Sequence, residues 1–89
     1  MTKVAVVTGG AGGIGQAVAD RLIKDNCAVV ILDINEEAGQ KVLADLRARG
    51  AGLLFQRADL TLEPEVQSAF EKITAAHGRV DVLVNVAGG

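Results

Sequence analysis

The stretch Thr8-Gly9-Gly10-Ala11-Gly12-Gly13-Ile14-Gly15 decides how this sequence folds. A β-branched apolar run, Lys3–Thr8, precedes it, and Ile14, Val18 and Leu22 then recur at a spacing of four residues. These patterns predict a strand buried on both faces, followed by a helix with one apolar face. Glycines between a strand and a helix permit positive φ angles and remove the Cβ atoms that would keep a phosphate away. The helix N-terminus offers free N–H groups to such an anion.

Strand and helix patterns alternate through the rest of the chain. Short apolar or β-branched runs predict three more strands, and amphipathic stretches predict two more helices. Small or polar residues suit the helix ends: Asn26, Gly50 and Gly78 as stops, and Asn35 as a cap. The predicted strands are Ala28–Asp33, Gly52–Ala58 and Val80–Asn85. One predicted helix lies between the Asn35 cap and the Gly50 stop, with Ala38, Val42 and Leu46 on its apolar face, and the other runs from Thr61 to His77.

The resulting order, β-α-β-α-β-α-β, predicts a four-stranded parallel sheet with helices on both faces. In the strand order 3-2-1-4, the ends of the first and fourth strands are neighbours. The two glycine clusters, Gly9–Gly15 and Gly88-Gly89, follow these two strands. Open α/β sheets bind ligands at this switch point, so we expect a ligand site there.

Composition narrows the function classes further. The 89 residues, 49% hydrophobic and 22% charged, predict one compact domain over residues 1–89. A net charge of −2 offers no basic surface to nucleic acid or to an anionic membrane, and no apolar run is long enough to span one. Cys27 is the only cysteine, which fits a reducing cytoplasm; it is either a small buried hydrophobe or a reactive thiol.

Asp33 is the second candidate for ligand recognition. It ends the second predicted strand, where a carboxylate can accept both ribose hydroxyls of an adenosine and repel a 2′-phosphate. No Arg or Lys lies in the glycine loop or just after Asp33, so the pattern favours NAD over NADP. The alternative is a loop or capping residue, although Asn35 is already available to cap the next helix.

Two further segments follow predicted strands three and four. Asp59-Leu60 suits the edge of an adenine ring, with the carboxylate accepting the exocyclic amine; a turn or cap is the alternative. Asn85-Val86-Ala87-Gly88-Gly89 has small residues that would let a ribose and a diphosphate pass the strand end; a plain loop is the alternative.

Together these residues resemble the N-terminal half of a classical short-chain dehydrogenase/reductase, an oxidoreductase family with a Rossmann fold. Thr8-Gly9-x-x-x-Gly13-x-Gly15 is similar to the family's cofactor motif, and Asp33 to the acidic residue of its NAD-preferring members. Asp59-Leu60 is similar to its adenine-contacting pair, and Asn85-Val86-Ala87-Gly88 to its Asn-Asn-Ala-Gly motif, with Val86 in place of the second Asn. The resemblance implies half of a Rossmann fold, with NAD bound by Gly9, Ala11, Gly12, Gly13, Ile14, Gly15, Asp33, Ile34, Asp59, Leu60, Asn85, Ala87 and Gly88.

The resemblance also implies hydride transfer between NAD and an alcohol/carbonyl pair. The resemblance implies a catalytic Ser, Tyr and Lys, which in the family lie beyond the position where this chain stops. This chain has no Tyr, and its only Ser is Ser68 on a predicted helix. We therefore expect a partial dinucleotide-binding domain, without its catalytic half, that is inactive alone.

Two alternatives from other classes stay open. One is an autonomous module that binds an ADP moiety without chemistry. The other is a self-associating half-domain, a homodimer through the edge of strand four or through a bare sheet face, in which Val82, Val84, Val4, Val6 and Val30 are partly exposed.

Overall fold

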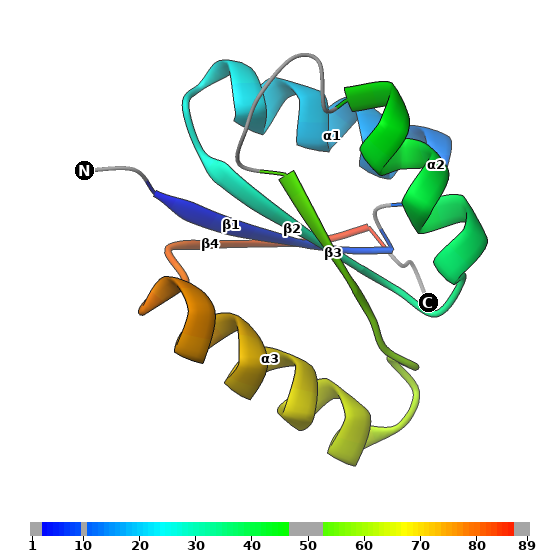
Figure 1. Cartoon of the computed structure of the whole chain (residues 1–89), viewed down its shortest axis with the longest axis vertical. Helices are drawn as coiled ribbons and strands as arrows, with labels where there is room; N and C mark the ends of the chain where they lie inside the picture. The colour runs from blue at the N-terminus through cyan, green and yellow to red at the C-terminus, as the bar shows by residue number, and fades with distance from the viewer. Residues whose placement is uncertain (1–2, 10, 47–52, 87–89) are drawn as a thin grey trace.

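The computed structural model describes residues 3–9, 11–46 and 53–86, which form one α/β unit. Its four strands are parallel and lie in the order β3-β2-β1-β4, as the sequence predicted. The glycine-rich stretch joins the first strand to the first helix (Figure 1). The elements are β1 (Val4–Thr8), α1 (Gly13–Lys24), β2 (Ala28–Asp33), α2 (Glu36–Leu46), β3 (Leu53–Arg57), α3 (Glu63–His77) and β4 (Val82–Asn85).

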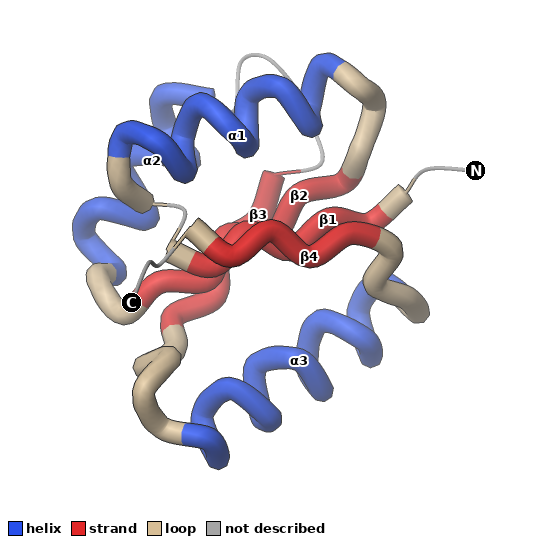
Figure 2. Tube along the Cα trace, turned by 180° about the vertical axis from the view of Figure 1, so that it is seen from behind, coloured by secondary structure: helices blue, strands red, loops and turns tan. Residues whose placement is uncertain are grey.

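The sheet lies between two helical layers. Helices α1 and α2 cover one face and α3 crosses the other (Figures 1 and 2). Alternate strand residues feed the two layers, so Ala5 and Val7 pack under α1 and α2 while Val6 and Val30 pack under α3. The expectation that Val4, Val6 and Val30 are partly exposed is wrong: they are 5%, 0% and 2% exposed, and Val6 and Val30 pack with Ala69 and Ile73 of α3.

The inner face of α1 differs from the predicted one. Its buried residues are Gly15, Ala19 and Ile23, one position along from the predicted stripe. Ile14 is 74% exposed, and Val18 and Leu22 are only partly buried. Small residues at the contact let the helix backbone approach the sheet closely, which leaves the larger side chains on the flank of the helix.

The predicted helix ends are mostly confirmed. Asn26 and Gly78 have φ angles of 66° and 81°, the left-handed values that end a helix. The Asn35 side chain caps α2, because its Oδ1 accepts a hydrogen bond of 3.0 Å from the Ala38 amide. Thr61 does not begin the third helix, which starts at Glu63. Leu62 is the N-cap residue, and no side chain caps this helix start. Gly50 lies outside the described residues.

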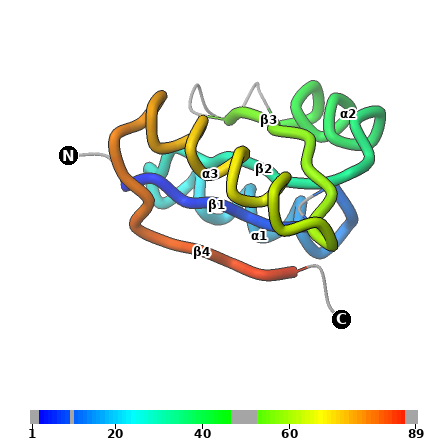
Figure 3. Tube along the Cα trace, turned by 90° about the horizontal axis from the view of Figure 1, so that it is seen from below, coloured from blue at the N-terminus to red at the C-terminus, as the bar shows by residue number. Residues whose placement is uncertain are grey.

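Both edge strands are short and differ in their surroundings. β3 lies at one edge, as its mixed composition predicted, and β4 lies at the other, away from β3 (Figure 3). β4 begins at Val82, two residues later than predicted. Asp81, just before it, bonds the start of β1 through both its side chain and its backbone. The Asp81 carboxylate accepts the Val4 amide at 2.8 Å, and the Asp81 amide donates to the Val4 carbonyl at 2.8 Å.

Val82 and Val84 are partly exposed, as predicted. No helix among residues 3–9, 11–46 and 53–86 is long and apolar enough to cross a membrane.

Candidate functional site

Backbone hydrogen bonds bring the ends of the four strands together at one edge of the sheet. Beyond the strand ladder, the Gly9 amide donates to the Leu32 carbonyl at 2.7 Å and the Val86 amide donates to the Thr8 carbonyl at 2.9 Å. A third bond of 3.1 Å joins the Ala58 amide to the Asp33 carbonyl. The glycine loop and the segments that follow β2, β3 and β4 therefore share one rim, which we call the C-terminal edge.

The glycine loop leaves an open space in front of α1. Gly9 has a φ of 71°, which turns the chain over the end of β2. A Cβ atom added at Gly12 or Gly13 would meet no atom of the described protein within 4 Å. The first turn of α1 has no side-chain cap and no acidic residue, so its N–H groups and dipole face that space. Gly10 lies outside the described residues.

Asp33 lies directly beside this loop. Its Oδ2 atom is 3.3 Å from the Ala11 amide, and its Oδ1 accepts the Asn35 amide at 3.0 Å. The first of these bonds is long, so Oδ2 is well placed to accept a stronger donor from a ligand. Ile34, the next residue, is 50% exposed on the same rim.

Asp59 follows β3 and is held by Thr61. Its Oδ1 atom accepts the Thr61 hydroxyl at 2.6 Å and the Thr61 amide at 3.0 Å. These two hydrogen bonds, the hydroxyl first, hold the pKa of Asp59 below its ordinary value of 3.8. Desolvation opposes them, and the nearby Arg57 charge lowers the pKa by the smallest amount. Asp59 is therefore an ionised acceptor at neutral pH. The adjacent Leu60 packs on the core beneath α3.

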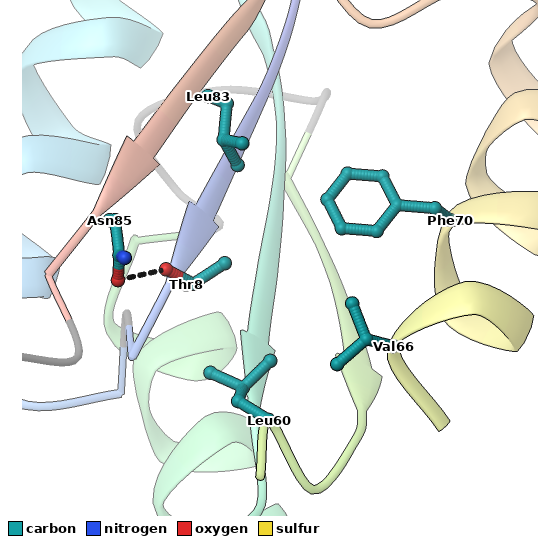
Figure 4. A pocket seen from close by; sticks show the side chains of 6 residues that line it. All are labelled: Thr8, Leu60, Val66, Phe70, Leu83 and Asn85. Atoms are coloured by element: carbon teal, nitrogen blue, oxygen red, sulfur yellow. Dashed lines mark hydrogen bonds between the residues drawn. The ribbon is translucent and has the colours of Figure 1, made fainter. Parts of the chain in front are cut away.

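Asn85 and Thr8 connect the ends of β4 and β1. The Thr8 hydroxyl donates to the Asn85 Oδ1 atom at 2.9 Å (Figure 4). Both residues line a cavity of about 280 Å³ between β1, β4 and α3, whose remaining walls are the apolar side chains of Leu60, Val66, Phe70 and Leu83. Ala87 and Gly88, the other expected residues of this segment, lie outside the described residues.

The structure thus gathers the described members of the predicted set near one rim. Ile14, in the first turn of α1, is 74% exposed, and Gly15 is buried on the inner face of the same helix. Glu65 belongs to no predicted site, yet its Oε1 accepts the Asp59 amide at 2.9 Å. The available signal was its place at the third position of α3, where an acidic side chain reaches back toward the preceding turn.

The described residues offer no metal site, and their only serine is Ser68. Ser68 is exposed on α3. Among residues 3–9, 11–46 and 53–86, no group of three or more acidic, histidine or cysteine side chains has the geometry of a metal site. Fold and rim together define an open α/β nucleotide-binding domain.

Comparison with known proteins gives the family. Residues 3–89 match the short chain dehydrogenase family model. The chain is 43% identical over 88 residues to the uncharacterized oxidoreductase YuxG of Bacillus subtilis, and covers 13% of that protein. Among solved structures, actinorhodin polyketide ketoreductase with NADPH has a TM-score of 0.94 and 35% identity over 99% of this chain, which spans 34% of that protein. NAD⁺-bound xylitol dehydrogenase has a TM-score of 0.87 and 36% identity over 91% of this chain, which spans 31% of that protein.

The chain belongs to the short-chain dehydrogenase/reductase family. It corresponds to the N-terminal, nicotinamide-cofactor-binding part of the family's oxidoreductases. It spans between 13% and 49% of the length of the curated relatives it matches.

Proposed function

We propose that this chain binds NAD through the ADP part of the cofactor. One observation carries the proposal: the Asp33 carboxylate lies 3.3 Å from the Ala11 amide, beside the uncapped start of α1. The N–H groups of the first turn of α1 are suited to the diphosphate, and Asp33 to the two hydroxyls of the adenosine ribose. An ADP moiety carries both groups, and NAD is a ligand that contains one.

The same carboxylate favours NAD over NADP. A 2′-phosphate on the adenosine ribose would place its negative charge next to Asp33, and Coulomb repulsion at contact distance disfavours it. The solved relatives include proteins crystallised with NAD⁺ and with NADPH, so the preference rests on Asp33 itself.

We assign the adenine to the turn after β3. The ionised Asp59 carboxylate accepts a hydrogen bond from the exocyclic amine, and the Leu60 backbone contacts the ring. The segment after β4 then lies along the adenosine ribose and the diphosphate. The full proposed set is Gly9, Ala11, Gly12, Gly13, Ile14, Gly15, Asp33, Ile34, Asp59, Leu60, Asn85, Ala87 and Gly88.

The reaction that such a site serves is hydride transfer between NAD and an alcohol/carbonyl pair, in which the cofactor carries the hydride. The chain contains no tyrosine, and its single serine, Ser68, lies on the exposed side of α3. We therefore propose that these 89 residues bind the cofactor and do not turn over an alcohol by themselves. The lone thiol of Cys27 supports the cytoplasm as the compartment.

Calorimetric titration with NAD and with NADP tests the proposal. We expect saturable NAD binding, weaker NADP binding, and a loss of about tenfold or more in NAD affinity for Asp33→Ala, as for a hydrogen bond to a charged group. Asp25→Ala removes an exposed carboxylate at the other end of α1 from the glycine loop and serves as the matched control with unchanged affinity. A cooperatively folded chain that binds neither dinucleotide, or equal affinities for wild type and Asp33→Ala, would refute the assignment.

A second candidate function is assembly, which the apolar surface beside β4 favours. Leu83 is 57% exposed on the α3 side of this strand, which lies at the edge of the described sheet. A second copy of the chain, or the C-terminal half that relatives of the family carry, would cover this surface and pair with the free edge of β4.

Sedimentation distinguishes the two candidates. We propose that the chain is a homodimer at tens of micromolar and that Leu83→Lys dissociates this dimer. A sedimentation mass of about 9 kDa for the wild type would exclude the dimer. An autonomous ADP-moiety module would instead remain monomeric and bind ADP-ribose as tightly as NAD.

A further inference from the structure

Glu65 anchors the main chain of the turn between β3 and α3. Its Oε1 atom accepts the Asp59 amide at 2.9 Å, six residues back along the chain. The same carboxylate oxygen lies 3.7 Å from the Arg57 guanidinium, on the other side of the turn. One side chain from the first turn of α3 therefore joins the last residue of β3 to the backbone of the turn.

Thr61 fixes the direction of the Asp59 carboxylate. Its hydroxyl and its amide both donate to Oδ1, so that oxygen is occupied by two donors from one residue. Within residues 53–86 and the other described segments, Oδ2 accepts no hydrogen bond. The carboxylate is thus held on one side and open on the other, as an acceptor for an external N–H group.

We propose that Thr61 and Glu65 are positioning residues for base recognition, which orient the Asp59 carboxylate to select adenine against hypoxanthine. Adenine carries an amino group at C6, which donates to a carboxylate. Hypoxanthine carries a carbonyl there, whose oxygen faces the carboxylate with no hydrogen between them. A carboxylate with fixed direction discriminates strongly between the two, whereas a freely rotating one pays an ordering cost that reduces the gain. The inference rests on the proposed dinucleotide site and adds the residues that set its base specificity.

The test compares NAD with nicotinamide hypoxanthine dinucleotide in calorimetric titrations of the same protein. Thr61→Val removes the hydroxyl and keeps the shape, while Thr61→Ser keeps the donor. Glu65→Ala removes the acceptor for the Asp59 amide, while Glu65→Gln keeps an acceptor oxygen and loses the charge. Glu63→Ala is the control, because Glu63 is an exposed carboxylate in the same first turn of α3 without a bond to the turn.

We expect Thr61→Val and Glu65→Ala to lower NAD affinity by about fivefold, the typical value of one hydrogen bond, with little change for the hypoxanthine dinucleotide. The ratio of the two affinities then falls by the same factor, and Thr61→Ser, Glu65→Gln and Glu63→Ala keep the wild-type ratio. An equal loss for both dinucleotides, or an unchanged ratio in Thr61→Val, would overturn the inference. NAD binding that requires Asp33 would leave the proposed function standing in that case.

Nuclear magnetic resonance gives a readout that needs no ligand. The Thr61 hydroxyl holds the pKa of Asp59 down, so Thr61→Val should raise the Asp59 pKa and Thr61→Ser should not. Glu65→Ala should speed hydrogen exchange of the Asp59 amide, and Glu63→Ala should leave it unchanged. Wild-type values in both variants would show that neither side chain holds the turn, whatever the chain binds.

Discussion

Gly39, inside α2, is the position where one added methyl group has the largest structural consequence. A Cβ atom built there would lie 2.2 Å from Cε1 and 2.4 Å from Cδ1 of the Phe55 ring on β3. Real Cβ contacts are about 3.4 Å or longer, so the ring must move by more than an ångström. Gly39 is buried and Phe55 is half-buried, hence the ring can leave only toward solvent.

The magnitude follows from two opposing terms. Alanine in a helix interior is more favourable than glycine by about 1 kcal/mol. Overpacking costs about 1 to 3 kcal/mol, and a fully displaced Phe55 would lose up to about 3 kcal/mol of hydrophobic burial. We expect Gly39→Ala to lower the free energy of unfolding by about 1 to 2 kcal/mol, which lowers Tm by roughly 4 to 16 °C for a chain of this size.

Thermal and urea unfolding of the four members of a double-mutant cycle measure this effect. Phe55→Leu shortens the ring and makes room for the methyl group, so Gly39→Ala should cost much less in its presence. A favourable coupling of about 1 kcal/mol between the two changes is the expected result. If Gly39→Ala is as stable as the wild type, or if the two changes are additive, the ring contact does not explain this glycine.

Three further predictions concern the sheet and the glycine loop. The Val4 amide and the Arg79 guanidinium hold the pKa of Asp81 below 3.8. Its contribution to stability is therefore present above 3.8 and is lost as pH falls through the lowered pKa. Urea unfolding of Asp81→Asn should show lower stability than the wild type at neutral pH and a smaller further loss of stability in acid. Thr8→Val removes the hydroxyl donor to Asn85 and should cost about 1 kcal/mol in the same assay, whereas an unchanged stability would mean that water replaces the bond equally well. Gly13→Ala should leave the free protein as stable or up to about 1 kcal/mol more stable, and should weaken NAD binding, because its methyl group enters the space in front of α1; unchanged NAD affinity would contradict this.

The sequence predicted the sheet well because its signals are local and redundant. Ala28–Asp33 is an unbroken apolar run that ends in a carboxylate, and the observed β2 has the same bounds. The strand order followed from connection rules that leave few arrangements for alternating strands and helices. Turn residues with a single conformational role, Asn26 and Gly78, were also correct, since their positive φ is a property of one residue.

Predictions that depended on packing between elements, such as which face of a helix lies on the sheet, were less successful. A spacing of four residues occurs in α1 both for Ile14 and its successors and for Gly15 and its successors, and sequence reasoning chose the larger side chains. The structure buries Gly15, Ala19 and Ile23, which include the smaller side chains. The distance between the helix and the sheet determines which side chains fit between them, and the sequence does not give that distance. The prediction that Thr61 begins the third helix was wrong because it also depended on a choice between partners. The Thr61 hydroxyl donates to the Asp59 carboxylate and does not cap the first turn of α3.

The glycines show where this limit matters for function. Gly39 and Gly13 are each glycines in helices, and the sequence alone gives both the same conformational freedom. In the structure the missing Cβ at Gly39 faces an aromatic ring of the protein, while the missing Cβ at Gly13 faces no atom of the described chain. Packing therefore explains the first glycine and leaves the second unexplained by the folded protein itself. A glycine that no internal contact requires, placed at an uncapped helix start beside Asp33, is what a site for a close-fitting phosphate ligand needs.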